Sequence, residues 1–159
     1  MKRFITLLLL LHLTACAELQ DVVNQLPQDV GISEADIGSG LVARKLLTDD
    51  SNTVCILAIG KMVGASLDAA ALLATKGIQA TVWDVRSCAP LDTKMIEDAA
   101  AHNVVITVED GIREGGIGMT IEDLVTHTSG TNRPVVEVLG IPKQFIPQAK
   151  PDAILSRLG

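Results

Sequence analysis

An acidic residue followed by a cluster of glycines is the part of the sequence best suited to chemistry. Glu109 ends the β-branched run at residues 104–108, and Gly115, Gly116 and Gly118 follow closely. A carboxylate at the end of a buried strand can act as a general acid or base, and glycines let backbone amides approach a ligand. This stretch is therefore the first candidate site.

The glycine-rich stretch does not match the phosphate-binding fingerprints. A dinucleotide fingerprint would need a third glycine where Ile121 stands, and a phosphate loop beginning at Gly111 would need lysine in place of Ile117. Two interpretations of Glu109 remain: direct catalysis, or a tight turn in which the carboxylate accepts backbone N–H groups. We favour the turn, because acids in perturbed surroundings are often structural.

A second candidate is Arg86, which ends another predicted strand and precedes Pro90. Its guanidinium can hold an anionic substrate or a partner carboxylate, or it can brace the loop against Asp84, Glu109 or Asp110. We favour bracing, because the sequence has no Ser-His-Asp order, no paired-carboxylate spacing and no cofactor signature. No catalytic residue is therefore assigned to this chain.

The cysteines and histidines give no metal-site pattern. Cys16, Cys55 and Cys88 have no CxxC spacing, and the histidines at positions 12, 102 and 127 are scattered. Each histidine is expected in a helix or at the surface. Cys55 lies inside an apolar run, which favours a buried, inert thiol. A metal site or redox dithiol is therefore not expected.

Charge and composition restrict the possible partners. The chain has 159 residues, a formal net charge of −6 and only 2% aromatic residues. Nucleic acid is not favoured as a partner, because phosphates require a basic surface and single strands also require stacking rings. With 48% hydrophobic residues, the composition suits one packed α/β domain plus an extension.

Residues 1–16 have the pattern of a secretory signal. Two basic residues precede an apolar stretch at residues 4–13, which is too short to span a bilayer comfortably. Leu-Thr-Ala-Cys then ends at Cys16 and resembles the lipobox of bacterial lipoproteins, which predicts lipidation of Cys16 and attachment to the cell envelope. A misassigned or fused reading frame is the alternative. Residues 17–40 form a polar linker that resembles the start of small bacterial lipoproteins.

Residues 41–159 alternate between predicted strands and helices. Apolar runs bounded by turn residues predict strands, and amphipathic segments predict helices. The first two strands are joined by a short turn and are expected to pair antiparallel. Right-handed crossovers then give a three-layer α/β fold with helices on both faces of a mixed sheet of about five strands, mostly parallel with one antiparallel edge strand. The expected strands cover residues 41–47, 54–59, 79–85, 104–108 and 134–139, and the expected helices cover residues 62–76, 92–102, a stretch reaching 128, and 151 onward.

Four motifs in this domain resemble, in order, the C-terminal domain of transketolase-like enzymes. They are Ile-Gly-Lys-Met-Val, Asp-Val-Arg-Ser-Cys-Ala-Pro-Leu-Asp, Thr-Val-Glu-Asp-Gly with its later glycines, and Leu-Gly-Ile-Pro-Lys-Gln-Phe-Ile-Pro-Gln. The last motif resembles 1-deoxy-D-xylulose-5-phosphate synthase and separates the chain from the pyruvate dehydrogenase E1 β branch. The Ser-Cys-Ala segment departs from the bulkier residues expected there. The predicted interface or loop-shaping residues are Arg86, Pro90, Glu109, Gly115, Gly116, Gly118 and Phe145.

The resemblance implies a pathway and a set of partner domains. The resembled enzymes condense pyruvate with glyceraldehyde 3-phosphate, using thiamine diphosphate and Mg²⁺ held between two other domains, in isoprenoid, thiamine and pyridoxal synthesis. The chain is therefore expected to be a detached or truncated third domain that binds no cofactor alone and acts with those domains or as a homo-oligomer. The family implies the cytoplasm, whereas the leader implies the envelope. A lipoprotein that uses the α/β domain for binding, and a chimeric frame joined near Gly40, are the alternatives.

Overall fold

The computed structural model describes residues 43–48, 51–131 and 133–158 of the chain. The predicted signal at residues 1–16, which includes Cys16, and the predicted linker at residues 17–40 lie outside the described residues. No helix among the described residues is long and apolar enough to cross a membrane. The elements follow in the order β1 (Ala43–Leu47), β2 (Val54–Ile59), α4 (Met62–Thr75), β3 (Ala80–Val85), α5 (Thr93–Ala100), β4 (Val104–Ile112), α6 (Ile117–Thr128), β5 (Val135–Ile141) and α7 (Pro151–Leu158).

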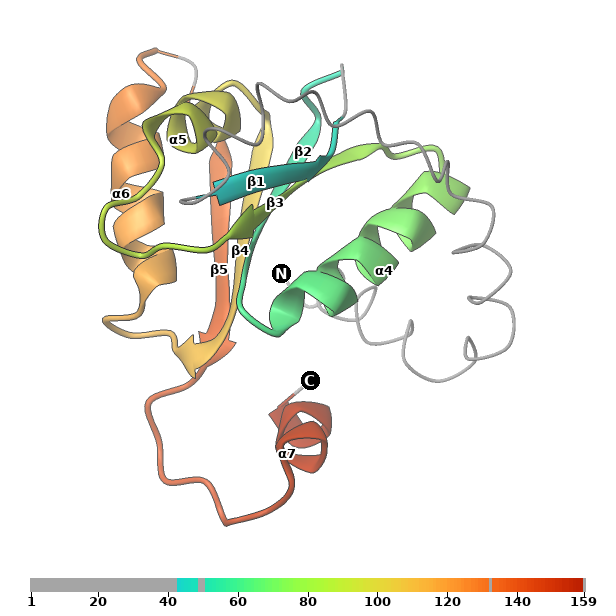
Figure 1. Ribbon diagram of the computed structural model, residues 1–159, viewed down its shortest axis with the longest axis vertical. Coiled ribbons are helices and arrows are strands. Elements are labelled where there is room, and N and C mark those ends of the chain that lie inside the picture. Colours follow the sequence, from blue (N-terminus) through green and yellow to red (C-terminus); the bar gives the residue numbers. More distant parts are fainter. Residues whose placement is uncertain (1–42, 49–50, 132, 159) are drawn as a thin grey trace.

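The strands form one mixed, five-stranded sheet in the order β1-β3-β2-β4-β5 (Figure 1). The four strands β3, β2, β4 and β5 run parallel, and β1 pairs antiparallel with β3 at the edge. The predicted α/β class, with a mostly parallel sheet and one antiparallel edge strand, is confirmed.

The prediction that the first two strands pair with each other is wrong. β1 pairs with β3, and β3 lies between β1 and β2. Neighbouring strands are about 4.8 Å apart, so β1 and β2 are separated by about 10 Å. The chain between them, residues 48–53, can reach about 20 Å when extended. A short link therefore leaves room for a third strand, and its length alone does not determine which strands pair.

Two apolar clusters cover the two faces of the sheet. The cluster under α5 and α6 includes the fully buried Leu57, Met95 and Ile121, and the cluster under α4 includes Ile56. Because successive strand residues point to opposite faces, Cys55 and Leu57 reach the first cluster while Ile56 reaches the second. The result is three layers, with α4 on one side of the sheet and α5 and α6 on the other (Figure 1).

The ends of several elements follow the local sequence. The Asp92 carboxylate accepts backbone N–H groups from the start of α5 at 2.9 and 3.2 Å, as the predicted N-cap. Gly77, with φ of +77°, follows α4 as the predicted stop. β4 is longer than predicted, because it continues beyond Glu109 after a register shift and pairs Ile112 with Ile141 of β5.

Candidate functional site

The carboxyl edge of the parallel strands is where the fold offers a site. After β2 the chain passes to α4 on one face of the sheet, and after β4 it passes to α6 on the other face (Figure 1). Ligands of open α/β sheets bind where neighbouring strands send their connections to opposite faces. β2 and β4 are such neighbours, and Lys61 after β2 forms an ion pair of 3.5 Å with Asp110 of β4.

Glu109 is buried at this edge and connects β4 to α6. The residue is 8% exposed, and its Oε1 accepts the backbone N–H of Gly118 at 3.0 Å. Gly118 belongs to the first turn of α6, where N–H groups have no partner within the helix and the helix dipole is positive. The carboxylate therefore stabilises the beginning of α6, which is the geometry of a loop-shaping acid.

Glycines surround the Glu109 carboxylate because a side chain would not fit beside it. A Cβ atom on Gly118 would lie 2.6 Å from Thr107 Oγ1, 2.8 Å from Val138 Cγ1 and 3.1 Å from Glu109 Oε1. A Cβ atom on Gly116 would collide with both oxygens of the same carboxylate. The two glycines thus allow α6 to begin directly against β4, with the acid enclosed between them.

Gly115 has a different role in the same turn. Its φ of +84° lies in the region that residues with a side chain rarely adopt, although a Cβ atom there would meet no neighbour. Its backbone conformation therefore reverses the chain, whereas the two later glycines permit close approach. The turn brings together Glu109 and all three glycines predicted from the sequence.

Glu114 connects this turn to the segment that follows β5. Its Oε2 accepts the backbone N–H of Lys143 at 3.0 Å, and its Oε1 accepts a hydrogen bond of 2.8 Å from Arg113 Nη2. The hydrogen bond from Arg113 is the main reason why the pKa of Glu114 is lowered, and backbone N–H groups, including that of Lys143, add to the effect. Sequence reasoning missed this contact because its two ends lie on different loops.

Acid pH is expected to release the link between Glu114 and Lys143. The pKa of Glu114 in the folded chain lies below its ordinary value of 4.5. The contribution to stability is therefore complete above that ordinary value and is lost as the pH falls through the lower folded value. The Lys143 amide resonance, followed by NMR from neutral to acid pH, should shift with a midpoint below 4.5. Glu114→Ala should abolish this shift, and a midpoint at or above the ordinary value would contradict the assignment.

Arg86 and Pro90 lie in the loop after β3, and β2 separates that strand from the strand of Glu109. Arg86 Nε donates to Asp84 Oδ2 at 2.8 Å, and Asp84 is one of the three acids named as possible bracing partners. The peptide bond between Ala89 and Pro90 is cis. The sheet order therefore places the Arg86 loop and the glycine turn on non-adjacent strands.

Phe145 is fully exposed in the segment between β5 and α7. Ile112 and Met119, on either side of the glycine turn, are 53% and 45% exposed. After β5 the chain turns away from the sheet and carries α7 apart from the other helices (Figure 1), and no residue of α7 is buried. Large exposed apolar side chains near one edge are typical of a surface that contacts another protein, which is compatible with the interface role predicted for Phe145.

Sequence reasoning also missed a polar group inside the domain. Cys55 on β2, Asp98 on α5 and the nearby His102 place a sulfur, a carboxylate oxygen and a ring nitrogen within 4.8 Å of one another. From the sequence, His102 is expected in a helix or at the surface. It lies just after α5 and is only 2% exposed, because its ring is buried near Cys55 of β2. Burial, followed by the negative charge of Asp98, raises the pKa of the Cys55 thiol well above its ordinary value. The thiol is therefore not activated as a nucleophile.

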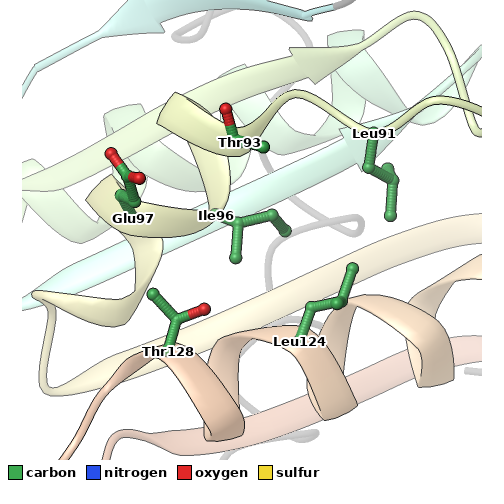
Figure 2. Close-up of a pocket in the computed structure, with 6 residues that line it drawn as sticks. All are labelled: Leu91, Thr93, Ile96, Glu97, Leu124 and Thr128. Atoms are coloured by element: carbon green, nitrogen blue, oxygen red, sulfur yellow. The ribbon is translucent and has the colours of Figure 1, made fainter.

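A groove of about 180 Å³ lies between α5 and α6 (Figure 2). Leu91 and Ile96 line one side, and Leu124 of α6 points toward them from the other side (Figure 2). Small-molecule sites usually enclose roughly 300–1,000 Å³. The groove is smaller than that, and none of the residues predicted from the sequence lines it. The complete lining is Leu91, Thr93, Ile96, Glu97, Leu124 and Thr128.

Neither the start of α6 nor the group of Cys55, Asp98 and His102 fits thiamine diphosphate or Mg²⁺. A diphosphate would need the free backbone N–H groups at the start of α6. The Glu109 carboxylate already accepts one of them, that of Gly118, and its negative charge would repel a diphosphate there. The group of Cys55, Asp98 and His102 offers sulfur and nitrogen, whereas Mg²⁺ prefers an octahedral set of oxygen ligands. No reaction step at these two places is therefore assigned to thiamine diphosphate or Mg²⁺.

The mixed sheet with helices on both faces defines a three-layer α/β domain. The sequence model for the transketolase C-terminal domain matches residues 44–159. The chain belongs to this family.

Curated relatives of the chain include 1-deoxy-D-xylulose-5-phosphate synthases. That of Renibacterium salmoninarum is 35% identical over 128 residues, which cover 80% of this chain and 19% of the relative. That of Leifsonia xyli subsp. xyli is 41% identical over 111 residues, covering 69% and 17% respectively. A solved split gene transketolase, an inactive beta4 tetramer, is similar with a TM-score of 0.63 and 28% identity over 72% of this chain and 36% of that one. The chain spans about a fifth of the length of these curated relatives.

Proposed function

We propose that residues 41–159 serve as the C-terminal domain of an enzyme of the 1-deoxy-D-xylulose-5-phosphate synthase type. The domain acts in assembly and dimerisation and is not catalytic alone. The observation that carries this proposal is the 35% and 41% identity to two such synthases. Because the matched region is only 19% and 17% of those proteins, the catalytic part of the enzyme would be supplied by other domains.

The carboxyl edge of the sheet supports an assembly role. The hydrogen bond to Gly118 and the surrounding glycines enclose Glu109 in a tightly packed turn. Near that turn, Ile112, Met119 and Phe145 expose large apolar side chains. Removing such apolar area from water is favourable by roughly 25 cal/mol per Å², against which the entropy cost of association is set. We infer that this edge packs against the cofactor-binding domains, in an enzyme that a second copy completes as a dimer.

Thiamine diphosphate and Mg²⁺ belong to the partner domains in this proposal. Pyruvate and glyceraldehyde 3-phosphate would be condensed there, outside the described residues. Within this domain, Glu109 bonds to the helix and Arg86 pairs with Asp84. The contribution of the domain is then the surface that holds the partner domains in position.

The test is a domain exchange in the Renibacterium salmoninarum relative. Residues 41–159 would replace its C-terminal domain, and product formation from pyruvate and glyceraldehyde 3-phosphate would be measured. We expect the chimera to be active, and we expect neither the lone chain nor the relative without its C-terminal domain to be active. Turnover by the lone chain would contradict the assembly role, and a folded but inactive chimera would contradict the family assignment of the activity.

Two surface variants of the chimera separate the edge from general surface effects. Phe145→Ser should lower product formation by the chimera, because Phe145 is an exposed apolar residue of the edge inferred to pack against the cofactor-binding domains. Val135→Ser is the matched control, since Val135 is 68% exposed at the opposite end of β5. Equal effects of the two substitutions would count against the carboxyl edge as the contact surface.

The lipobox-like sequence supports a second proposal, an envelope lipoprotein that uses the same domain for binding. The motif that favours it is Leu-Thr-Ala-Cys ending at Cys16 after a basic and apolar leader. Metabolic labelling with palmitate is the test, and the Cys16→Ser variant is its control. Label on the parent chain and none on the variant would support lipidation and an envelope location, whereas an unlabelled parent would remove the basis for both.

A further inference from the structure

We propose that Cys55, Asp98 and His102 form a binding site for a divalent metal ion of the zinc class. The site lies under α5, apart from the glycine turn, and does not depend on the assembly role. Its sulfur, carboxylate oxygen and ring nitrogen lie within 4.8 Å of one another. Thiolate, imidazole and carboxylate are the protein ligands that zinc accepts, and a water molecule can take a fourth position.

His102 has the protonation pattern of a metal ligand. Its Nδ1 lies 2.7 Å from the backbone carbonyl oxygen of Asp98. A carbonyl oxygen can only accept a hydrogen bond, so Nδ1 carries a proton, and in the neutral ring Nε2 then has the lone pair. Within the described part of the chain, Nε2 is buried and has no hydrogen-bond partner. An imidazole fixed through one nitrogen and open at the other is the form in which histidine binds metals.

Cys55 lies on a central strand of the sheet, whereas Asp98 and His102 lie at the end of a helix, which can shift more easily. Cys55 is fully buried on the central strand β2. Asp98 lies in the last turn of α5, and His102 lies just beyond the end of that helix, where its ring folds back onto the Asp98 carbonyl. Zinc–sulfur and zinc–nitrogen bonds of about 2.3 and 2.0 Å require ligand atoms roughly 3.5 Å apart. Binding therefore needs a contraction from at most 4.8 Å to roughly 3.5 Å, about 1.3 Å at most, which the end of α5 can supply.

Asp98 connects the proposed site to the surface. Its Oδ1 accepts from Lys45 Nζ at 2.8 Å, and its Oδ2 accepts from Trp83 Nε1 at 2.7 Å. Each carboxylate oxygen has a second lone pair for a cation. The side chains of Lys45 and Asp98 are 29% and 27% exposed, so the carboxylate is the part of the proposed site that solvent reaches. Lys45 is then the positive charge with which the ion competes.

Metal binding at this site exchanges the thiol proton of Cys55 for the metal ion. The S–H bond of Cys55 breaks, a sulfur–metal bond forms, and the thiol proton leaves to solvent. The His102 lone pair and the Asp98 carboxylate complete the protein ligands without losing a proton. No oxidant or reductant is needed, because zinc-class ions keep their charge in such sites.

Cobalt is the probe for this site, because Co²⁺ bound to a thiolate gives a charge-transfer band that free Co²⁺ lacks. The experiment uses the full chain with Cys16→Ser and Cys88→Ser, so that Cys55 is the only thiol. We expect one equivalent of Co²⁺ to produce the band and Zn²⁺ to displace it. Cys55→Ala should abolish the band, and His102→Gln should weaken Co²⁺ binding by at least about tenfold.

A charge variant tests the carboxylate separately. Lys45→Met should tighten Co²⁺ binding by roughly fivefold, because the competing cation beside Asp98 is removed. Circular dichroism would establish that each variant is folded. If His102→Gln does not fold, Cys55→Ala still decides the result, since it removes only a small side chain. A parent chain without the band, a band that persists in Cys55→Ala, or an affinity unchanged by Lys45→Met would overturn the three-residue site.

Discussion

Replacing Glu109 by alanine is expected to lower the free energy of unfolding by about 2–3 kcal/mol. The substitution removes the acceptor of the Gly118 N–H, a bond of 3.0 Å at a residue that is 8% exposed. The helix α6 also loses the negative charge at its positive end, which is worth roughly 0.3–1 kcal/mol near the surface. Urea unfolding followed by circular dichroism measures the change.

The neighbouring acid provides the control for this prediction. Asp110→Ala removes a carboxylate that is 40% exposed and pairs with Lys61 at 3.5 Å. Exposed ion pairs contribute at most about 1 kcal/mol, so its effect should be clearly smaller. In the domain-exchange enzyme, Glu109→Ala should reduce the assembled fraction and leave the turnover of each assembled enzyme unchanged. A stable, normally assembling Glu109→Ala variant would contradict the loop-shaping role.

The elements of this fold could be predicted because their signals are local. The apolar run of β2, the alanine-rich α4 and the Asp92 cap each lie within a few residues, and all three occur in the structure. The neighbour of β1 could not be predicted in that way, because β3 joins the sheet between β1 and β2 from a distant part of the sequence. The extension of β4 to Ile112 likewise depends on pairing with Ile141 of β5.

The same distinction applies to the sites. Glu109 and its glycines could be recognised because one short stretch of chain contains all of them, and their relation follows from a strand that turns directly into a helix. The link between Glu114 and Lys143 spans 29 positions, and Cys55 meets Asp98 and His102 only after α5 packs on β2. The sequence spacing of these residues does not indicate that they are in contact, because the sheet order and helix packing bring them together.

Hydrogen bonding and packing explain why Glu109 and the later glycines occur together in one motif. A buried carboxylate needs hydrogen-bond donors, and here the first turn of α6 supplies one through Gly118. Such a donor can reach the acid only if the residues packed directly against the carboxylate have no side chain, which is the case at Gly116 and Gly118. The acid and the later glycines are therefore one packing unit, and substitutions within the unit should not have additive effects on stability.

Replacing Gly118 by alanine should destabilise the chain most among the single substitutions considered, by about 3 kcal/mol. The added Cβ would lie 2.6 Å from Thr107 Oγ1 and 2.8 Å from Val138 Cγ1, so the start of α6 must move away from β4. That movement also strains the hydrogen bond to Glu109. Urea unfolding measures the loss, and Thr107→Ala in the same chain should recover part of it by removing the nearest colliding atom.

Gly64→Ala is the matched control for this substitution, because Gly64 is also near the start of a helix. A Cβ atom on Gly64 would meet nothing within 4 Å, so alanine should stabilise α4 by about 0.5–1 kcal/mol through its higher helix propensity. The same change of residue type is thus expected to have opposite signs in α4 and α6. If both variants proved more stable than the parent chain, a side chain at position 118 would be tolerated. The close contact between α6 and β4 around Glu109 would then not depend on glycine at that position.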